Sequence, residues 1–412
     1  MADPSAPGLS RTLSRWSLAI YGLGTILGAG IYVVVGKVAG HAGALAPFAF
    51  LIAAIAAGFT GFSYAELSGR VPESGGSAAF IARGFSRKAL TTIAGWALIA
   101  TGLVSAATIT TGFVGYMGVF IEVSPLFAIP LAVGMITFVA AIGVKEAVWL
   151  MILTTALEVS GLVIVMVFAG PAIADYPARF ADALEAGASL QLAGGVMLAS
   201  VLAFYAFIGF EDLATLSEEV QDTSRDIPFA IVWALASSLI FYVVISAIAV
   251  SALDPAALGE SEAPLADVVA AHGGPDGLLA AISLATILNG ALAQIVMASR
   301  VIHDLGSRRG GAPAWLAAIN PRTHTPLYAS MLCGIVIAAL ALFFPTEALA
   351  AGTSILILLI FAAACIALMV MKRRGDPVPD GCRTVPAWVP ALGAGSCLVL
   401  VCAQIALTIT GQ

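Results

Sequence analysis

The stretch "YGLGTILGAGIYVVVG", residues 21–36, decides how this chain is interpreted. It lies in an apolar run long enough for a membrane helix, yet five of its residues are glycine. Glycine in a helix interior costs roughly 0.5–1 kcal/mol relative to alanine. Small residues in membrane helices often allow neighbouring helices to pack closely. The stretch alone therefore leaves two interpretations open: close packing, or a helix interrupted for function.

The composition indicates a polytopic helical membrane protein. The chain is 60% hydrophobic and 10% charged, with a mean hydropathy of +1.02. A soluble domain carries about 25% charged residues. The polar start predicts a cytoplasmic N-terminal tail, residues 1–15, without a cleavable signal peptide. The expected surroundings are a lipid bilayer, and nothing in the pattern predicts a nucleic-acid partner.

Apolar runs bounded by charge, proline and glycine predict about eleven transmembrane helices. We expect them near residues 17–39, 44–68, 89–118, 125–143, 147–170, 192–218, 228–252, 277–304, 326–344, 348–371 and 387–409. With the N-terminus inside, sixteen of the 18 Lys and Arg residues fall on inner segments, leaving Lys37 and Arg179 outside. This bias predicts a plasma (cell inner) membrane protein with a cytoplasmic N-terminus and an outside C-terminus.

A second interrupted segment lies in the sixth predicted helix. It reads "FYAFIGFEDLATLSEEV", with Gly209 followed by the acids Glu211 and Asp212. Carboxylates deep in a membrane helix are costly and rarely face lipid. The first and sixth helices occupy corresponding positions in an inverted repeat of five helices, and interrupted helices at such positions indicate a transporter's binding site. Freed N–H groups suit a carboxylate and freed carbonyls suit an ammonium, which together predict an amino acid as substrate.

Four segments carry a resemblance to a known family. They are "GTILGAGIY", "SYAELSGRVPESGGSAAFIARGF", "FYAFIGFEDLATLSEEVQDTSRDIPFAI" and "SRVIHDLGSRRGGAPAWLAAINPRTHTP". Together they resemble the amino acid–polyamine–organocation (APC) transporter superfamily, in particular bacterial relatives of cationic amino acid transporters. The resemblance implies a leucine-transporter-type 5+5 inverted repeat with broken helices 1 and 6, working by alternating access. The ten-helix core would span residues 16–371, with repeats near 16–170 and 192–371, followed by an inner loop and eleventh helix in 372–412.

The resemblance also implies roles for individual residues. Backbone N–H groups for a substrate carboxylate would come from Gly28, Ala29 and Gly30. Carbonyls for its ammonium would come from Ile26, Tyr205 and Ile208, with Gly209 as the break. An aromatic wall or lid would be formed by Phe204, Tyr205, Phe207 and Phe210. Gating would involve Phe210, Glu211 and Asp212, with Glu211 at the position of an acidic gating residue in some relatives.

Glu158 is the candidate for ion coupling. It lies thirteen residues after Lys145, about 20 Å along a helix, and so near the middle of the bilayer. No Lys or Arg is expected at that depth, so the carboxyl should be protonated or face water. By resemblance it occupies the place of a lysine that stands in for a sodium ion. Three interpretations stay open: a proton carrier, a cation ligand, or a protonated carboxyl with a purely structural hydrogen bond.

Other polar residues fit simpler interpretations. Glu66 is expected to pair with Arg70 at the inner end of the second helix. A polar face on the third helix serves interhelical hydrogen bonds or the pocket, and a similar face lies on the eighth helix. These faces consist of Thr101, Ser105 and Thr108, and of Ser283, Thr286 and Asn289. Neither the five cysteines nor the four histidines show metal or catalytic spacing, so no cofactor, metal site or enzymatic activity is predicted.

The sequence therefore predicts a secondary transporter of an amino acid or related amine. Proton symport is the first choice for its energy source and exchange of amino acids or polyamines is the second, with the proton preferred to sodium as the coupling ion. A different class, a non-transporting amino acid sensor or partner-dependent subunit, is kept as a further alternative. The three acids Glu158, Glu211 and Asp212 favour a cationic substrate, while aromatic and small apolar residues favour a neutral one.

Overall fold

The described part of the chain is almost entirely helical. The computed structural model describes residues 13–73, 75–118, 120–121, 123–142, 144–185, 190–261, 263–275, 277–323 and 325–410. Most of the expected tail, residues 1–12, lies outside this part. Within the described ranges, the β-type pairing found is an isolated bridge between Leu13 and Val220.

Helices occupy all eleven ranges expected from the sequence. The α-helices are α1 (Arg15–Ala42), α2 (Ala46–Arg70), α3 (Gly76–Phe85), α4 (Lys88–Gly118), α5 (Pro125–Ile142), α6 (Val144–Ala169), α7 (Tyr176–Glu185), α8 (Leu190–Tyr205), α9 (Asp212–Thr215), α10 (Thr223–Ala252), α11 (Pro255–Glu260), α12 (Pro264–Ala271), α13 (Leu278–Asp304), α14 (Ala314–Ala317), α15 (Leu327–Phe343), α16 (Thr346–Arg374) and α17 (Trp388–Thr410). In the described residues, eight helical stretches are long and apolar enough to cross a membrane, and two shorter apolar helices accompany them. The number of crossings, eleven, stays a prediction.

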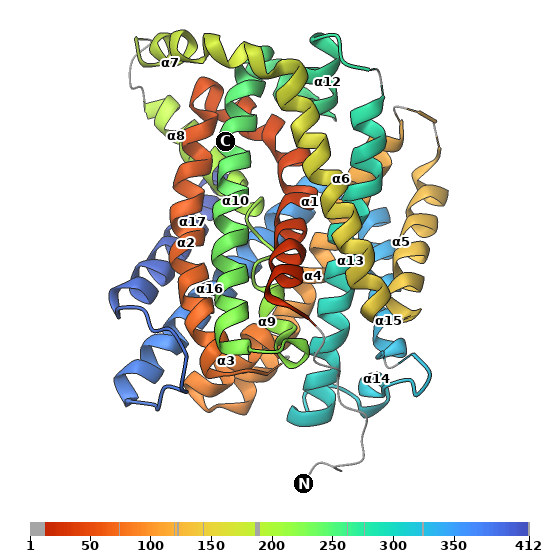
Figure 1. Ribbon diagram of the computed structural model, residues 1–412, viewed down its shortest axis with the longest axis vertical. Helices are drawn as coiled ribbons and strands as arrows, with labels where there is room; N and C mark the ends of the chain where they lie inside the picture. Colours follow the sequence, from red (N-terminus) through yellow and green to blue (C-terminus); the bar gives the residue numbers. More distant parts are fainter. Residues whose placement is uncertain are drawn as a thin grey trace.

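The long helices form two groups that meet at the centre of the molecule. In the first group α1 packs on α8 and α10, and α2 packs on the same two helices. In the second group α4 packs along α13, and α5 packs along α15 (Figure 1). The pairs α1 with α8, α2 with α10, α4 with α13 and α5 with α15 each join predicted spans five places apart. This pairing is what a 5+5 inverted repeat requires.

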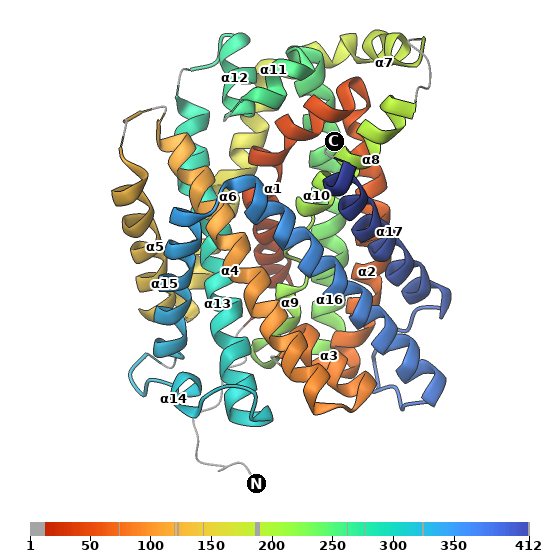
Figure 2. The same ribbon diagram turned by 180° about the vertical axis from the view of Figure 1, so that it is seen from behind.

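The remaining helices cover the outside and the two ends of the bundle. Seen from behind, α16 crosses the molecule obliquely and α17 lies beside it (Figure 2). Helices α3 and α14 lie at one end, here called the α3 face, and α7, α11 and α12 lie at the other, the α7 face (Figures 1 and 2). Helix α3 occupies the loop after the second predicted span, and α7 occupies the polar segment after the fifth.

The predicted break in the sixth span is confirmed. Helix α8 ends at Tyr205, residues 206–211 form turns, and the short α9 follows. Gly209 adopts a φ of 126°, a backbone conformation that L-residues with side chains rarely adopt. Its N–H donates to the Glu211 carboxylate, 2.8 Å from Oε2. A side chain of the break itself therefore satisfies one of the backbone groups that have no helical hydrogen-bond partner here.

The predicted break in the first span is wrong for this structure, because α1 runs unbroken from Arg15 to Ala42. Its glycines serve close packing instead. A Cβ on Gly30 would lie 2.8 Å from the Ala206 carbonyl oxygen, and one on Gly28 would lie 3.4 Å from a Glu158 carboxylate oxygen. A Cβ on Gly24 would overlap the Thr155 hydroxyl. The glycine-rich face thus lets α6 and the turn after α8 approach the α1 backbone.

Candidate substrate and ion-coupling site

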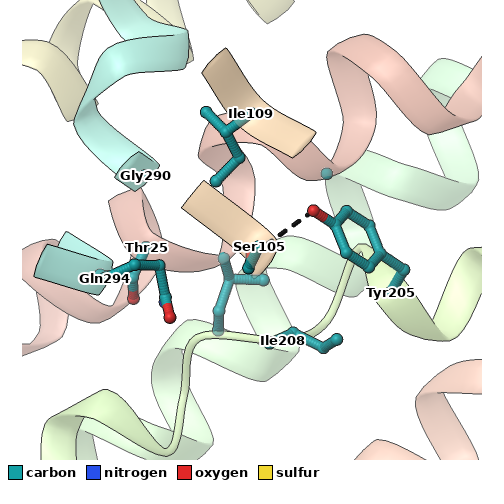
Figure 3. A pocket seen from close by; sticks show the side chains of 9 residues that line it. Thr25, Ser105, Ile109, Tyr205, Ile208, Gly290 and Gln294 are labelled. Atoms are coloured by element: carbon teal, nitrogen blue, oxygen red, sulfur yellow. Dashed lines mark hydrogen bonds between the residues drawn. The ribbon is translucent and has the colours of Figure 1, made fainter. Parts of the chain in front are cut away.

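A small cavity lies where the two helix groups meet. Its walls come from α1, α4, the end of α8 with the following turn, and α13. The lining residues are Thr25, Ile26, Gly30, Ser105, Ile109, Tyr205, Ile208, Gly290 and Gln294 (Figure 3). Its volume is about 20 Å³, enough for about one water molecule. A site for a small organic ligand is roughly 300–1,000 Å³, so the cavity as it stands, called the contracted form below, has no room for an amino acid.

The cavity wall combines neutral polar groups with branched apolar side chains. The hydroxyl groups of Ser105 and Tyr205 lie 3.5 Å apart across it (Figure 3). Ile26, Ile109 and Ile208 supply the apolar surface, and among the described residues that line the cavity there is no carboxylate or cationic side chain. The wall is therefore suited to a ligand with polar groups at one end and an uncharged, aliphatic part.

Four of the predicted substrate-binding residues line the cavity: Ile26, Gly30, Tyr205 and Ile208. Gly28 and Gly209 are close by but do not line it. Within the continuous α1, the N–H groups of residues 28–30 lie in the helix interior, where they belong to the helix hydrogen-bond ladder. Capture of a carboxylate by Gly28, Ala29 and Gly30 would need this turn to open. The side chain of Ala29 lies outside the described residues.

The predicted aromatic residues other than Tyr205 pack into the core. The ring of Phe204 lies 6.2 Å from that of Phe361, and the ring of Phe207 lies 5.0 Å from that of Tyr242. Phe210 also packs against Phe361, with the ring centroids 5.1 Å apart. All three phenylalanines are fully buried and none is among the residues lining the cavity, so here they support the break rather than form a wall.

Two tertiary contacts hold the break against α1. The Tyr242 hydroxyl of α10 lies 2.7 Å from the Ile26 carbonyl oxygen and 2.6 Å from that of Ala206, so its proton can go to either. The Thr25 hydroxyl lies within donating distance of two more carbonyls, those of Gly22 at 2.9 Å and Gly209 at 3.2 Å. The positions of α1 and the break are therefore coupled through hydroxyl groups next to the cavity.

Glu158 belongs to α6 and lies next to Gly28 of α1, whereas the turn after α8 lies next to Gly30. It is fully buried, and one carboxylate oxygen lies 3.4 Å from the Asn289 amide nitrogen on α13. Its other oxygen, Oε2, and the Asn289 oxygen have no hydrogen-bond partner. The Tyr32 hydroxyl donates to the Glu158 main-chain carbonyl, 2.7 Å away. A carboxylate with one long hydrogen bond and no cationic partner among the described residues is far from satisfied as an anion.

A second buried acid lies on the break. Asp212 accepts a 3.0 Å hydrogen bond from the Gln294 amide, and its other oxygen has no partner. Asn289 and Gln294, both on α13, thus each hold one carboxylate, and Gly290 between them lines the cavity. The predicted gating acids Glu211 and Asp212 lie next to the cavity wall without forming it.

Sequence reasoning missed Thr25, Ile109, Gly290 and Gln294 as cavity residues. Gln294 could have been found, since it is an isolated carboxamide in an apolar span, five residues after Asn289. The polar face predicted on the third span indicated one cavity residue correctly, because Ser105 lines the cavity. Thr101 and Thr108 of the same face donate to carbonyls of their own helix. Among the described residues, no group of three His, Cys, Asp or Glu side chains could hold a metal ion.

The fold is that of a membrane transporter of the leucine-transporter type. A solved structure of a substrate-bound, outward-open Na⁺-coupled sialic acid symporter superposes with a TM-score of 0.58 at 12% identity, covering 97% of this chain and 90% of the symporter. The amino acid permease family matches residues 13–411. The chain belongs to this family of the APC superfamily, which confirms the resemblance seen in the sequence. A permease moves solutes rather than converting them, in agreement with the predicted lack of enzymatic activity.

Relatives in the family include bacterial and plant proteins. The branched-chain amino acid permease BcaP of Bacillus subtilis is 28% identical, covering 97% of this chain and 89% of BcaP. The vacuolar cationic amino acid transporter 4 of Arabidopsis thaliana is 29% identical, covering 92% of this chain and 66% of the plant protein. The two names indicate different substrate charges, so membership of the family leaves the substrate class of this chain open.

Proposed function

We propose that this chain is a secondary transporter that moves a neutral amino acid across the plasma membrane by proton-coupled symport. The observation that carries the proposal is the position of the cavity. Thr25, Ile26 and Ile208 belong to the first helix group, whereas Ser105 and Gln294 belong to the second. A rocking motion of one group against the other would expose this site to each side in turn, which is alternating access.

A neutral substrate follows from the chemistry of the wall. Burying an ammonium side chain without a carboxylate partner is strongly unfavourable, and the described lining residues supply hydroxyl, amide and aliphatic groups only. None of the three acids that favoured a cationic substrate on sequence alone lines the cavity. Glu211 accepts from Gly209, Asp212 from Gln294 and Glu158 from Asn289. The name of the relative BcaP agrees with an aliphatic amino acid.

Competition tests the substrate class. Uptake of radiolabelled L-leucine into proteoliposomes is measured with excess unlabelled isoleucine, alanine, lysine or arginine. The neutral aliphatic amino acids should compete and the cationic ones should not. Strong competition by lysine alone would reject a neutral substrate, and binding of no amino acid or amine in a thermal-shift screen would reject amino acid transport altogether.

Coupling is assigned to Glu158. In the contracted site, a proton on this carboxyl group removes the cost of an unpaired buried charge. When the site opens to water on one side, water solvates the carboxylate, the charged form becomes less unfavourable and the proton can leave. Leucine uptake is measured with imposed proton and sodium gradients, in the wild type and in Glu158→Gln. Full proton-driven uptake in the variant would rule out Glu158 as the proton carrier. Wild-type uptake that follows only the sodium gradient would identify sodium, and not the proton, as the coupling ion.

The α3 face is assigned to the cytoplasm, because basic residues of the predicted inner segments, among them Arg70, Arg83, Lys372 and Arg374, belong to helices that end there. In this orientation the C-terminal end of α17 lies outside. Protease or antibody access to a C-terminal tag in intact spheroplasts should then occur without permeabilising the cells. Access only after permeabilisation would overturn the orientation.

A further inference from the structure

Asp212 is a buried carboxylate that one side chain connects to the cavity. It has no exposed surface. Gln294, which lines the cavity, donates to its Oδ2 over 3.0 Å, while Oδ1 has no partner. An ionised carboxylate offers about four acceptor positions, and a single neutral donor leaves its charge poorly compensated. The geometry is therefore suited to a protonated carboxyl group.

The charged groups around Asp212 do not supply a free cation. Glu211 is its neighbour in sequence, and its carboxylate already accepts the Gly209 N–H. Arg300 of α13 lies 2.7 Å from Glu219, so its charge is matched by that carboxylate. The other ionisable side chains on the described elements packed against α9 are Arg15, Tyr21, Tyr32, Lys37 and His41 of α1, His303 and Asp304 of α13, Arg83 of α3, and Arg225, Asp226 and Tyr242 of α10. Arg15, Lys37, Arg83 and Arg225 are exposed, and the His303 ring bonds to the Ala317 carbonyl. Since two adjacent carboxylates resist being ionised together, the proton belongs on Asp212, the less satisfied of the two.

The arrangement repeats the one at Glu158. Each acid is fully buried, each is bonded to one carboxamide of α13, and each has one oxygen without a partner. The two carboxamides, Asn289 and Gln294, are five residues apart, about 7.5 Å along the helix. The Glu158–Asn289 and Asp212–Gln294 pairs therefore flank the cavity residue Gly290 along α13. The proposal above assigns a coupling role to Glu158 but none to Asp212.

We propose that Asp212 is a second proton-binding site and that two protons accompany each substrate. This inference rests on the proposed proton-coupled transport and adds its stoichiometry. With the site open to the outside, a proton from water binds the Asp212 carboxylate through the hydrated cavity. With the site open to the α3 face, where the Arg300–Glu219 pair must separate, the same proton returns to water. Gln294 couples the event to the substrate, because one side chain touches both the cavity and the acid.

Infrared difference spectra of the purified protein test the site without any substrate. Spectra at acidic and alkaline pH should contain the C=O stretch of protonated carboxyl groups. Asp212→Asn should remove one component and Glu158→Gln another, while Asp182→Asn, at an exposed position on α7, should leave both. If Asp212→Asn is poorly folded, Gln294→Met should keep the component to higher pH, because it removes the donor that favours the anion. A spectrum unchanged by both Asp212→Asn and Gln294→Met would overturn the proposal.

Transport measurements test the stoichiometry. With the membrane potential clamped at zero, each pH unit should raise leucine accumulation about tenfold for one proton and about hundredfold for two. The wild type should follow the steeper relation and Asp212→Asn the shallower one. Equal slopes for both would show that Asp212 carries no coupled proton, even if Glu158 does. A wild type insensitive to the pH gradient would instead reject the proposed symport, and the infrared spectra would still decide whether Asp212 binds a proton.

Discussion

Arg300 of α13 and Glu219 form an ion pair 2.7 Å long, and each side chain is only 7% exposed. The same Glu219 accepts a main-chain hydrogen bond from Leu13, 3.1 Å long, and Leu13 pairs with Val220. This short segment therefore connects the start of α1, the end of the broken span and helix α13 of the second group. Along α13, Arg300 lies between Gln294 of the cavity wall and the end of the helix at the α3 face.

The Arg300–Glu219 pair should act as a gate on the α3 face. Removing one partner of a buried ion pair costs about 3–5 kcal/mol in the state that contains it. In Arg300→Ala, a cysteine introduced at Thr25 in a background without the native cysteines should react with a thiol reagent from the α3 face at least about tenfold faster. Arg225→Ala is the matched control, because Arg225 and Asp222 form an exposed pair 3.7 Å apart. Equal labelling rates in Arg300→Ala and its parent would contradict a gating role.

Gly209→Ala should strongly impair transport. The residue has a φ of 126°, and strain of this kind costs about 1–3 kcal/mol for a residue with a side chain. The added Cβ would also lie 2.7 Å from the Thr25 carbonyl oxygen. We expect initial leucine uptake to fall by about tenfold or more. Gly194→Ala, in open space on α8, should keep wild-type uptake; a normal rate in Gly209→Ala would show that the break tolerates a side chain.

The positions of the spans could be predicted because hydrophobicity along the chain reports the bilayer directly. The break at Gly209 was also predictable, since two acids follow the glycine inside an apolar run. The continuity of α1 was not. Whether Gly24, Gly28 and Gly30 interrupt a helix or accommodate neighbours depends on Thr155, Glu158 and Ala206, which approach only through the tertiary fold.

The candidate site also contains residues that the sequence could predict and residues that it could not. Glu158 could be predicted because it is a carboxylate in an apolar span, with no Lys or Arg expected at the same depth. The structure places it fully buried beside Asn289. Gln294 carries no charge, and its contacts with both the cavity and Asp212 depend on the rotation of α13 about its axis. The packing of Phe204 and Phe207 away from the cavity likewise follows from their neighbours Phe361 and Tyr242, which are distant in sequence.

Glu66 should be a major stabilising residue of the α3 face. The predicted pair with Arg70 is confirmed at 2.7 Å, and Lys372 of α16 also lies 2.7 Å from the same fully buried carboxylate. The Val385 N–H donates to it over 2.8 Å, so one carboxylate connects α2, α16 and the loop before α17.

Glu66→Ala would leave two cations without their shared partner, so we expect a loss of about 3–5 kcal/mol in the free energy of unfolding. Thermal unfolding in detergent should show a clearly lower midpoint. Glu185→Ala removes an exposed carboxylate on α7 and should leave the midpoint within experimental error. A midpoint for Glu66→Ala equal to that of Glu185→Ala would refute the stabilising role.

Tyr242→Phe should slow transport while the fold is retained. The hydroxyl lies within 2.7 Å of carbonyl oxygens on both α1 and the break, those of Ile26 and Ala206, whereas the ring keeps its packing on Phe207 in the variant. Losing such a hydrogen bond and leaving a buried carbonyl unpaired costs about 1–3 kcal/mol. Because the bond holds the two cavity-forming backbones together in the contracted state, which has no room for leucine, its loss should favour the states that bind substrate. The KM for leucine and the maximal uptake rate should both fall several-fold, whereas the unfolding midpoint should change little. Tyr328→Phe, at an exposed position on α15, serves as the control. A Tyr242→Phe protein with wild-type KM but a lowered midpoint would assign the hydroxyl to stability alone.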